Sequence, residues 1–234
     1  MNLFFTMAGN YSRFGNFSLK LPKFLLPFDK SNIFSHILKN LKNKEIKNYY
    51  FILNKKDAYF FKFVEQQIKN LKIKNYKLII IDKTNSQIET AIKGVNSLKN
   101  SINLNDPVGF MNIDTILKKR NLKNYLNKLR TNDLFIDIFN SSNKSYSYVL
   151  CNKKQQVFSI KEKIVISDYA SSGFYIFKNL KFINILKKEK FSYFSELINY
   201  MIRQNYIATC NKITKYEETI VLGTPEQYIA EIQK

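Results

Sequence analysis

The chain has 234 residues, of which 45% are hydrophobic and 24% are charged, and this balance suits one large globular domain. Its two cysteines, Cys151 and Cys210, are far apart and match no metal-binding spacing, as in proteins of a reducing compartment. No stretch approaches the ~18 apolar residues of a membrane-spanning helix, and the first residues lack the pattern of a signal peptide. We therefore expect a cytoplasmic protein without a membrane span.

The net charge of +20 comes almost entirely from lysine, because only four residues are arginine. Proteins that read nucleic acids rely on the bidentate fork of arginine. The lysines here are scattered along the chain and form no single basic block. We expect a compositional bias on solvated surfaces and no nucleic-acid partner, with attraction of anionic substrates as the alternative.

The first half of the chain alternates short apolar runs with helical patterns. The apolar runs predict strands at 2–7, 48–53, 77–82 and 108–113, and the periodicity predicts helices at 31–41, 57–71 and 87–98. Strands that are apolar on both faces and alternate with helices indicate a parallel sheet covered by helices.

The second half has a different pattern, with more strands and shorter links. It predicts a helix at 116–129, strands at 133–139, 145–151, 156–160 and 172–177, helices at 179–188 and 193–204, a strand at 219–222 and a closing helix. We therefore predict an α/β fold: a Rossmann-like, mostly parallel mixed sheet flanked by helices, with an antiparallel insertion in the second half. No linker or repeat divides residues 1–234, so a single domain is expected.

Scarce residues gather at the predicted ends of strands, where ligands bind in an open α/β sheet. Gly9 follows the first strand and suits either a loop whose N–H groups meet phosphate oxygens or an ordinary turn. Arg13 and Lys23 supply cations beside it. Asp114 ends the fourth strand, where it can hold Mg²⁺ together with substrate phosphates or cap a following helix.

Several other kinds of chemistry lack the residues that they need. The single histidine, His36, lies in a helical pattern, so zinc sites and Ser-His-Asp triads are disfavoured. Neither the P-loop motif nor the dinucleotide motif G-x-G-x-x-G is present. Phosphoryl or nucleotidyl transfer remains, since positioning and charge neutralisation dominate that chemistry.

Six segments that follow one another along the chain carry recognisable motifs. They are Met7-Ala8-Gly9-x-x-Ser12-Arg13-Phe14 with Leu21-Pro22-Lys23, Gln87-Ile88-Glu89-Thr90-Ala91, Asn112-Ile113-Asp114, Glu162-Lys163, Gly173-Phe174-Tyr175-Ile176-Phe177 and Gly223-Thr224-Pro225-Glu226. Together and in this order they resemble the sugar-phosphate nucleotidyltransferase family, in its capsule or surface-glycan branch. The resemblance covers almost the whole chain.

The resemblance implies a Mg²⁺-dependent enzyme that couples a nucleoside triphosphate to a sugar phosphate or a related phosphorylated metabolite and releases pyrophosphate. CTP or another pyrimidine triphosphate is favoured, for capsule or surface polysaccharide biosynthesis. Residues 1–115 would form the nucleotide-binding half and 116–234 the acceptor-binding half. The implied site residues are Arg13, Lys23 and Asp114 for catalysis, Ala8, Gly9, Asn10, Ser12, Gln87 and Thr90 for the nucleotide, and Asn112, Glu162, Lys163 and Gly173 for the acceptor.

The sequence departs from the family pattern at two places. Asn10-Tyr11-Ser12 replaces a more glycine-rich loop, and Val221-Leu222 stands where the family often has a second metal carboxylate. Glu217 or Glu218 is the candidate substitute for that ligand. A glycosyltransferase of the same fold is one alternative, although the usual D-x-D motif is missing, and a non-catalytic nucleotide-binding relative is another.

Overall fold

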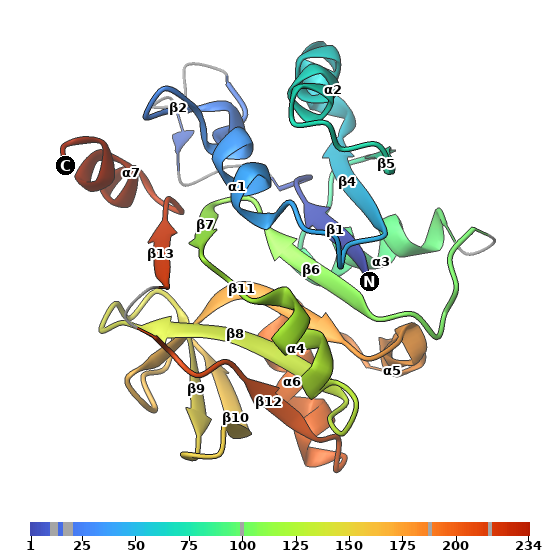
Figure 1. Ribbon diagram of the computed structural model, residues 1–234, viewed down its shortest axis with the longest axis vertical. Coiled ribbons are helices and arrows are strands. Elements are labelled where there is room, and N and C mark those ends of the chain that lie inside the picture. Colours follow the sequence, from blue (N-terminus) through green and yellow to red (C-terminus); the bar gives the residue numbers. More distant parts are fainter. Residues whose placement is uncertain (10–13, 16–20, 99–100, 187–188, 215–216) are drawn as a thin grey trace.

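Figure 1 shows the protein as a computed structural model, which describes residues 1–9, 14–15, 21–98, 101–186, 189–214 and 217–234. The strands are β1 (Asn2–Thr6), β2 (Pro27–Phe28), β3 (Ser31–Asn32), β4 (Asn48–Asn54), β5 (Tyr76–Ile81), β6 (Val108–Asn112), β7 (Thr115–Lys118), β8 (Leu134–Asn140), β9 (Ser147–Cys151), β10 (Gln156–Glu162), β11 (Tyr169–Phe177), β12 (Ala208–Cys210) and β13 (Glu218–Val221). The α-helices are α1 (Ile33–Leu41), α2 (Phe61–Asn70), α3 (Gln87–Asn96), α4 (Leu122–Lys128), α5 (Ile183–Leu186), α6 (Phe194–Arg203) and α7 (Pro225–Ile232). Short 3₁₀ turns are η2 (Lys23–Leu25), η3 (Lys55–Phe60) and η4 (Leu180–Phe182).

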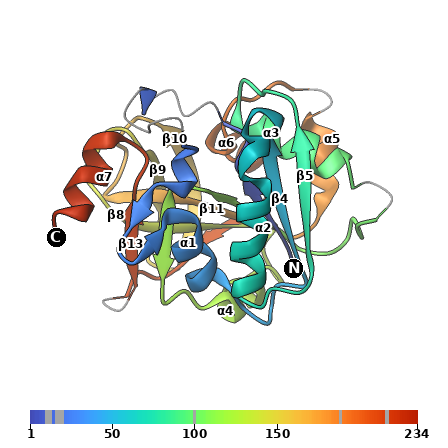
Figure 2. The ribbon, with the colours of Figure 1, turned by 90° about the horizontal axis from the view of Figure 1, so that it is seen from above.

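A nine-stranded mixed sheet in the order β5-β4-β1-β6-β11-β8-β12-β10-β9 runs through the molecule. Its first four strands are mutually parallel, as the sequence predicts. Side chains of β1 alternate between two buried clusters: Leu3 and Phe5 pack with α1 and α2, and Phe4 packs with α3 and α6. Helices α1 and α2 lie side by side on their face of the sheet (Figure 2). Burial on both faces explains why these strands are continuously apolar.

The second half of the chain continues the same sheet and closes on itself. β11 is antiparallel to both β6 and β8, β12 is parallel to β8, and β10 is antiparallel to β12 and β9. β9 also pairs with β11 through Ala170 and Tyr148, which completes a small closed mixed sheet. The expected "mostly parallel" sheet with an insertion therefore needs correction, because parallel pairs are concentrated in the first half and the antiparallel strands extend that sheet.

The predicted helix at 116–129 is wrong over its first part. Residues 115–118 form β7, which pairs with β13 in a separate two-stranded ribbon. Lys119 has φ +59°, so the backbone turns there, and Asn121 caps α4 by accepting from the Asn124 N–H at 3.0 Å. Ile116 and Leu117 are both fully buried, and a short run of this kind fits either element. The sequence also did not predict the three-residue strand β12 (Ala208–Cys210).

Two side-chain caps fix helix starts that matter for the site. Asn32 accepts from the Ser35 N–H at 2.9 Å at the start of α1, and Ser86 accepts from the Glu89 N–H at 3.1 Å at the start of α3. α3 therefore begins one residue after Ser86, as predicted. Within the described part of the chain, every helix is too short or too polar to cross a membrane.

Candidate active site

A pocket of about 510 Å³ opens at the carboxyl ends of β1 and β6. Its wall comes from the residues after β1, the start of η2, the first turn of α3, the β6–β7 junction, β9 to β11, the start of α6 and the end of β13. Elements from both halves of the chain therefore meet in one hollow. This is the edge at which open α/β sheets bind ligands.

The centre of the pocket holds an ion pair between two predicted catalytic residues. Lys23 Nζ lies 2.7 Å from Asp114 Oδ2, and their side chains are 12% and 22% exposed. The Lys23 ammonium also lies 5.7 Å from the centroid of the Phe14 ring. On the other side, the Thr115 hydroxyl donates to Asp114 Oδ1 at 3.2 Å. The structure thus brings together two residues that are 91 positions apart.

The loop after β1 is described only in part. Gly9 lines the pocket, and a Cβ added there would meet no atom within 4 Å, so a ligand could approach this backbone closely. Ala8 is fully buried, and its carbonyl oxygen accepts from Asn54 Nδ2 at 3.1 Å. The predicted residues Asn10, Ser12 and Arg13 lie outside the described part of the chain, so their placement stays a prediction.

Residues at the start of α3 form a polar part of the pocket wall. Gln87 Nε2 donates to Asn112 Oδ1, which links a predicted nucleotide residue to a predicted acceptor residue. Thr90 is buried; its hydroxyl donates to the Ser86 carbonyl oxygen at 3.1 Å and lies 2.6 Å from the Thr84 hydroxyl. Both predicted residues line the pocket, but the hydroxyl of Thr90 is already bonded within the protein.

The predicted acceptor residue Glu162 places its carboxylate among hydroxyl groups. Glu162 Oε2 accepts from the hydroxyls of Ser147 and Ser195, the latter at 2.8 Å. Lys163 is exposed, and its Nζ lies 5.8 Å from the ring centroid of Tyr193, which lines the pocket. Lys163 is thus close to a lining residue but is not itself among the residues that line the pocket. Its backbone has φ +55° and its N–H donates to the Tyr146 carbonyl oxygen at 3.0 Å.

Gly173 is required by its surroundings. Its φ is +82°, a conformation that residues with a side chain rarely adopt, and an added Cβ would overlap the side-chain amide of Asn112. It lies in a bulge of β11, between Ser171 and Tyr175, whose partners on β8 are only two residues apart. The absence of a side chain at Gly173 therefore lets β11 approach Asn112, at the end of the neighbouring strand β6, closely.

Gln227 and Tyr146 are a hydrogen-bonded pair of this site that the sequence did not predict. Gln227 Nε2 donates to the Tyr146 hydroxyl at 2.6 Å, and Gln227 Oε1 accepts from the Gly223 and Thr224 N–H groups at 3.0 and 3.1 Å. Burial and the nearby Asp114 carboxylate raise the pKa of Tyr146 to about 12. The capping-box spacing Thr224-x-x-Gln227 was a signal for Gln227, whereas Tyr146 stood in a segment predicted as strand.

Neither candidate for a second metal ligand lines the pocket. Glu217 accepts from Asn211 Nδ2 at 3.2 Å and Glu218 pairs with Lys118 at 2.8 Å, and both border another hollow. Val221 lines the pocket instead. Among the described residues, no three His, Cys, Asp or Glu side chains gather as a metal site would require. Of the predicted metal ligands, Asp114 alone lies in the described lining of the pocket, and this fits Mg²⁺ carried mainly by substrate phosphates.

Comparison with solved structures places this fold among known enzymes. The chain is similar to the nucleoside-diphosphate-sugar pyrophosphorylase from Vibrio cholerae, with a TM-score of 0.84, 22% identity and coverage of 99% of this chain and 100% of that one. It is similar to a putative glucose-1-phosphate thymidylyltransferase from Bacillus anthracis in complex with a sucrose (TM-score 0.78, 16% identity, 100% and 94% coverage). A UDP-glucose pyrophosphorylase complexed with UDP-glucose gives a TM-score of 0.78 at 15% identity, with 99% and 97% coverage.

The sequence itself is matched less broadly. Among curated proteins, none matches it at a significant level. The family model "Nucleotidyl transferase", in contrast, matches residues 7–232, which span the pocket from the loop after β1 to α7. This chain therefore belongs to the nucleotidyl transferase family of enzymes.

Proposed function

We propose that the chain transfers a nucleotidyl group from a nucleoside triphosphate to a sugar phosphate or related phosphorylated metabolite and releases pyrophosphate. The observation that supports this proposal is the pocket itself, whose lining contains the Lys23–Asp114 ion pair, Glu162 and Tyr193, the last with the Lys163 ammonium 5.8 Å from its ring centroid. Residues 1–115 would bind the nucleotide and 116–234 the acceptor, in a single domain. Sugar nucleotides as products agree with two of the similar structures, a nucleoside-diphosphate-sugar pyrophosphorylase and a UDP-glucose pyrophosphorylase complexed with UDP-glucose.

The reaction requires two anions to approach each other. An oxygen of the acceptor phosphate forms a bond to the α-phosphorus, the bond from that phosphorus to the β-phosphate bridge breaks, and its electron pair leaves with pyrophosphate. Unit charges 4 Å apart repel by about 4 kcal/mol at an effective dielectric of 20. Lys23 and Arg13 would offset this repulsion on the triphosphate and Lys163 would do so on the acceptor. No general base is needed, since a phosphate monoester is largely ionised at pH 7.

We include Mg²⁺ as the expected metal, with Asp114 as its protein ligand. The ion would neutralise phosphate charge and polarise the α-phosphate when bound. Thr115 holds one Asp114 oxygen and Lys23 holds the other at 2.7 Å. The ammonium therefore orients the carboxylate, and both residues line the pocket.

We favour CTP, then other pyrimidine triphosphates, as the nucleotide. The contact with Asn112 uses one N–H of the Gln87 amide and leaves the amide oxygen as an acceptor. An exocyclic amino group such as N4 of cytosine supplies the matching donor. A pocket of about 510 Å³ that must also hold the acceptor favours the smaller pyrimidine ring. A role in capsule or surface polysaccharide synthesis would follow for a product of this class.

The test is a pyrophosphate-release screen of CTP, UTP, dTTP, ATP and GTP against sugar 1-phosphates and other phosphorylated metabolites with Mg²⁺. Release that requires both substrates, together with a nucleotide-linked product by mass spectrometry, would support the proposal. Asp114→Asn is the inactive control, and Lys118→Met, outside the pocket, is the matched active control. Pyrophosphate release from none of these pairs would refute the proposed reaction.

A further inference from the structure

The ribbon formed by β7 and β13 joins the pocket to a second polar cluster. At the pocket end Val221 pairs with Thr115, and the Leu222 N–H donates to the Asp114 carbonyl oxygen at 2.7 Å. At the other end Glu218 pairs with Lys118. The position of Asp114 therefore depends on how this short ribbon is held against the main sheet.

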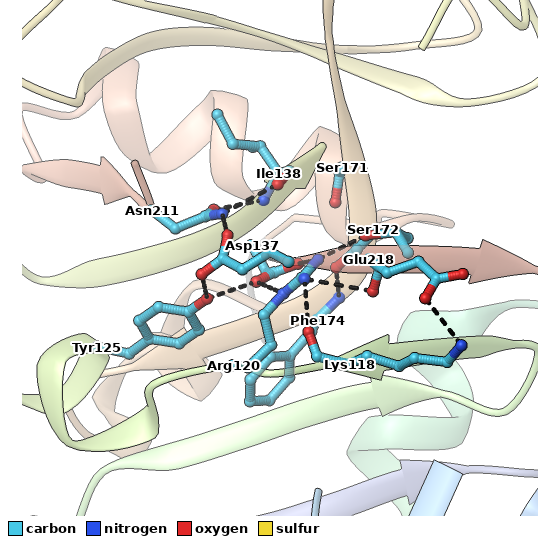
Figure 3. Close-up of polar contacts among 12 residues, drawn as sticks. Lys118, Arg120, Tyr125, Asp137, Ile138, Ser171, Ser172, Phe174, Asn211 and Glu218 are labelled. Atoms are coloured by element: carbon cyan, nitrogen blue, oxygen red, sulfur yellow. Dashed lines mark hydrogen bonds and ion pairs between the residues drawn. The ribbon is translucent and has the colours of Figure 1, made fainter. Parts of the chain in front are cut away.

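A buried ion pair holds the far end of the ribbon (Figure 3). Arg120 Nε and Nη2 donate to the two Asp137 oxygens at 2.8 and 3.1 Å, and the two side chains are 1% and 0% exposed. The same guanidinium donates to the Lys118 and Glu218 carbonyl oxygens at 3.2 and 3.4 Å and to the Thr219 hydroxyl. All five N–H groups of Arg120 thus have acceptors, which lie on both ribbon strands and on β8.

Asp137 lies opposite the bulge that carries Gly173. On β8, Ile138 pairs with Ser171 and Ile136 pairs with Tyr175, so the single residue Asp137 faces the three residues 172–174 of β11. The carboxylate is further fixed by the Tyr125 hydroxyl, which donates to Asp137 Oδ2 at 3.0 Å. One ion pair therefore contacts the ribbon that follows Asp114, and one of its members, Asp137, stands opposite the bulge that carries Gly173.

Stability alone is a poor explanation for such a pair. Taking both charges out of water costs about as much as their attraction returns, and well-packed apolar residues often serve as well or better. A guanidinium with five directed bonds instead fixes one geometry, which lysine or an apolar side chain cannot reproduce. The contacts that it fixes join β7 and β13 to β8, and Arg120 borders the second hollow together with Glu218 and Thr219.

We propose that Arg120 and Asp137 are positioning residues of the reaction, which hold the β7–β13 ribbon against the β11 bulge and so set the placement of Asp114 relative to Gly173. They touch no substrate and act through the ribbon. The proposal rests on the proposed nucleotidyl transfer, since the placement matters only if Asp114 serves the triphosphate. Misplacing a group of this kind by about 1 Å can lower a rate by about 100-fold.

The test compares Arg120→Lys and Asp137→Asn with Lys118→Met, which removes the exposed ion pair of the same ribbon. Amide hydrogen exchange of Leu222 reports the pocket end of the ribbon without any substrate, and steady-state kinetics report the reaction. We expect Leu222 to exchange at least about tenfold faster in both variants while amides of β1 and β4 keep their rates, with kcat lowered about 10- to 100-fold and acceptor KM within about threefold. Lys118→Met should leave both readouts unchanged.

A uniform rise in exchange over β1, β4 and Leu222, with kcat per folded molecule unchanged, would overturn the proposal and leave a purely structural role. The same effects in Lys118→Met would also overturn it. If Arg120→Lys does not fold, Thr219→Val removes one guanidinium contact at similar volume and carries the same two readouts. If the wild-type chain releases no pyrophosphate, the proposed function fails. The exchange rate of the Leu222 amide then decides by itself whether Arg120 and Asp137 hold the β7–β13 ribbon in place.

Discussion

Asp114→Asn should have opposite effects on nucleotide binding with and without metal. The substitution keeps the shape of the side chain and removes the negative charge that lies 2.7 Å from Lys23 Nζ. Without metal, a triphosphate entering the pocket is repelled by the negative charge of the Asp114 carboxylate. Lys23 must also give up its ion pair with Asp114 in order to pair with the triphosphate. With Mg²⁺, the carboxylate becomes a ligand whose loss weakens the complex.

The magnitude follows from the geometry. One pair of unit charges about 4 Å apart contributes about 4 kcal/mol at an effective dielectric of 20. The Asp114 side chain is 22% exposed, so solvent screening lowers this figure. Even a third of it, about 1.4 kcal/mol, changes a dissociation constant tenfold. We therefore expect Asp114→Asn to bind metal-free CTP about tenfold more tightly and to lower kcat with Mg²⁺ by about 10²–10³-fold or more.

Isothermal titration calorimetry with CTP in EDTA and in Mg²⁺ measures both effects. Lys23→Met is the matched control, because it removes the other member of the pair and should weaken nucleotide binding under both conditions. Weaker binding of metal-free CTP by Asp114→Asn would contradict the electrostatic reasoning. Near-wild-type kcat in this variant would remove Asp114 from the reaction.

Three further predictions concern the walls of the pocket. Lys163→Ala should raise the acceptor KM without changing the nucleotide KM if Lys163 binds the acceptor phosphate as proposed, since its ammonium lies 5.8 Å from the ring centroid of Tyr193, a lining residue; initial-rate kinetics with each substrate varied test this. Gly173→Ala should destabilise the fold by about 2 kcal/mol or more in urea unfolding, because φ is +82° and the new methyl group overlaps Asn112. The pKa of Tyr146 is raised to about 12, so its contribution to stability is complete below pH 10 and is lost as pH rises through 12; Tyr146→Phe should lose less stability over that range in thermal melts.

Short-range sequence patterns predicted those elements of the fold whose structure depends on residues close to them in the chain. The alternation of Leu3, Phe4 and Phe5 between two buried clusters is visible as a continuous apolar run. The junction at residues 115–121 failed because Ile116 and Leu117 fit a helix as well as a strand, and β13, about a hundred residues away, decides between them. The closure of β9 on β11 depends likewise on distant pairing that no short window contains.

The residues of the candidate site fall into the same two groups, those that local motifs predict and those that depend on contacts between distant positions. Lys23, Asp114, Gly173 and Glu162 are found because each lies in a motif with a fixed local spacing. Gln227 and Tyr146 were missed because their hydrogen bond joins positions 81 residues apart, and neither residue type is distinctive alone. The sequence can thus name residues that line the pocket, but the hydrogen bonds that hold other lining residues in place emerge only from the fold.

The distribution of charge clarifies how this basic protein could handle anionic substrates. Although the chain carries a net charge of +20, the charged residues among the described lining of the pocket are Lys23, Asp114 and Glu162. The excess positive charge therefore lies largely outside the described lining, where it raises the local concentration of anions but is screened over about 8 Å at physiological salt. Within the described lining, a carboxylate balances the Lys23 ammonium, so these residues by themselves would give a metal-free triphosphate little net attraction. Under the proposed function, these described charges would suit a nucleotide that brings its own Mg²⁺, and Val221 adds no carboxylate at the position where the family often has a second metal ligand.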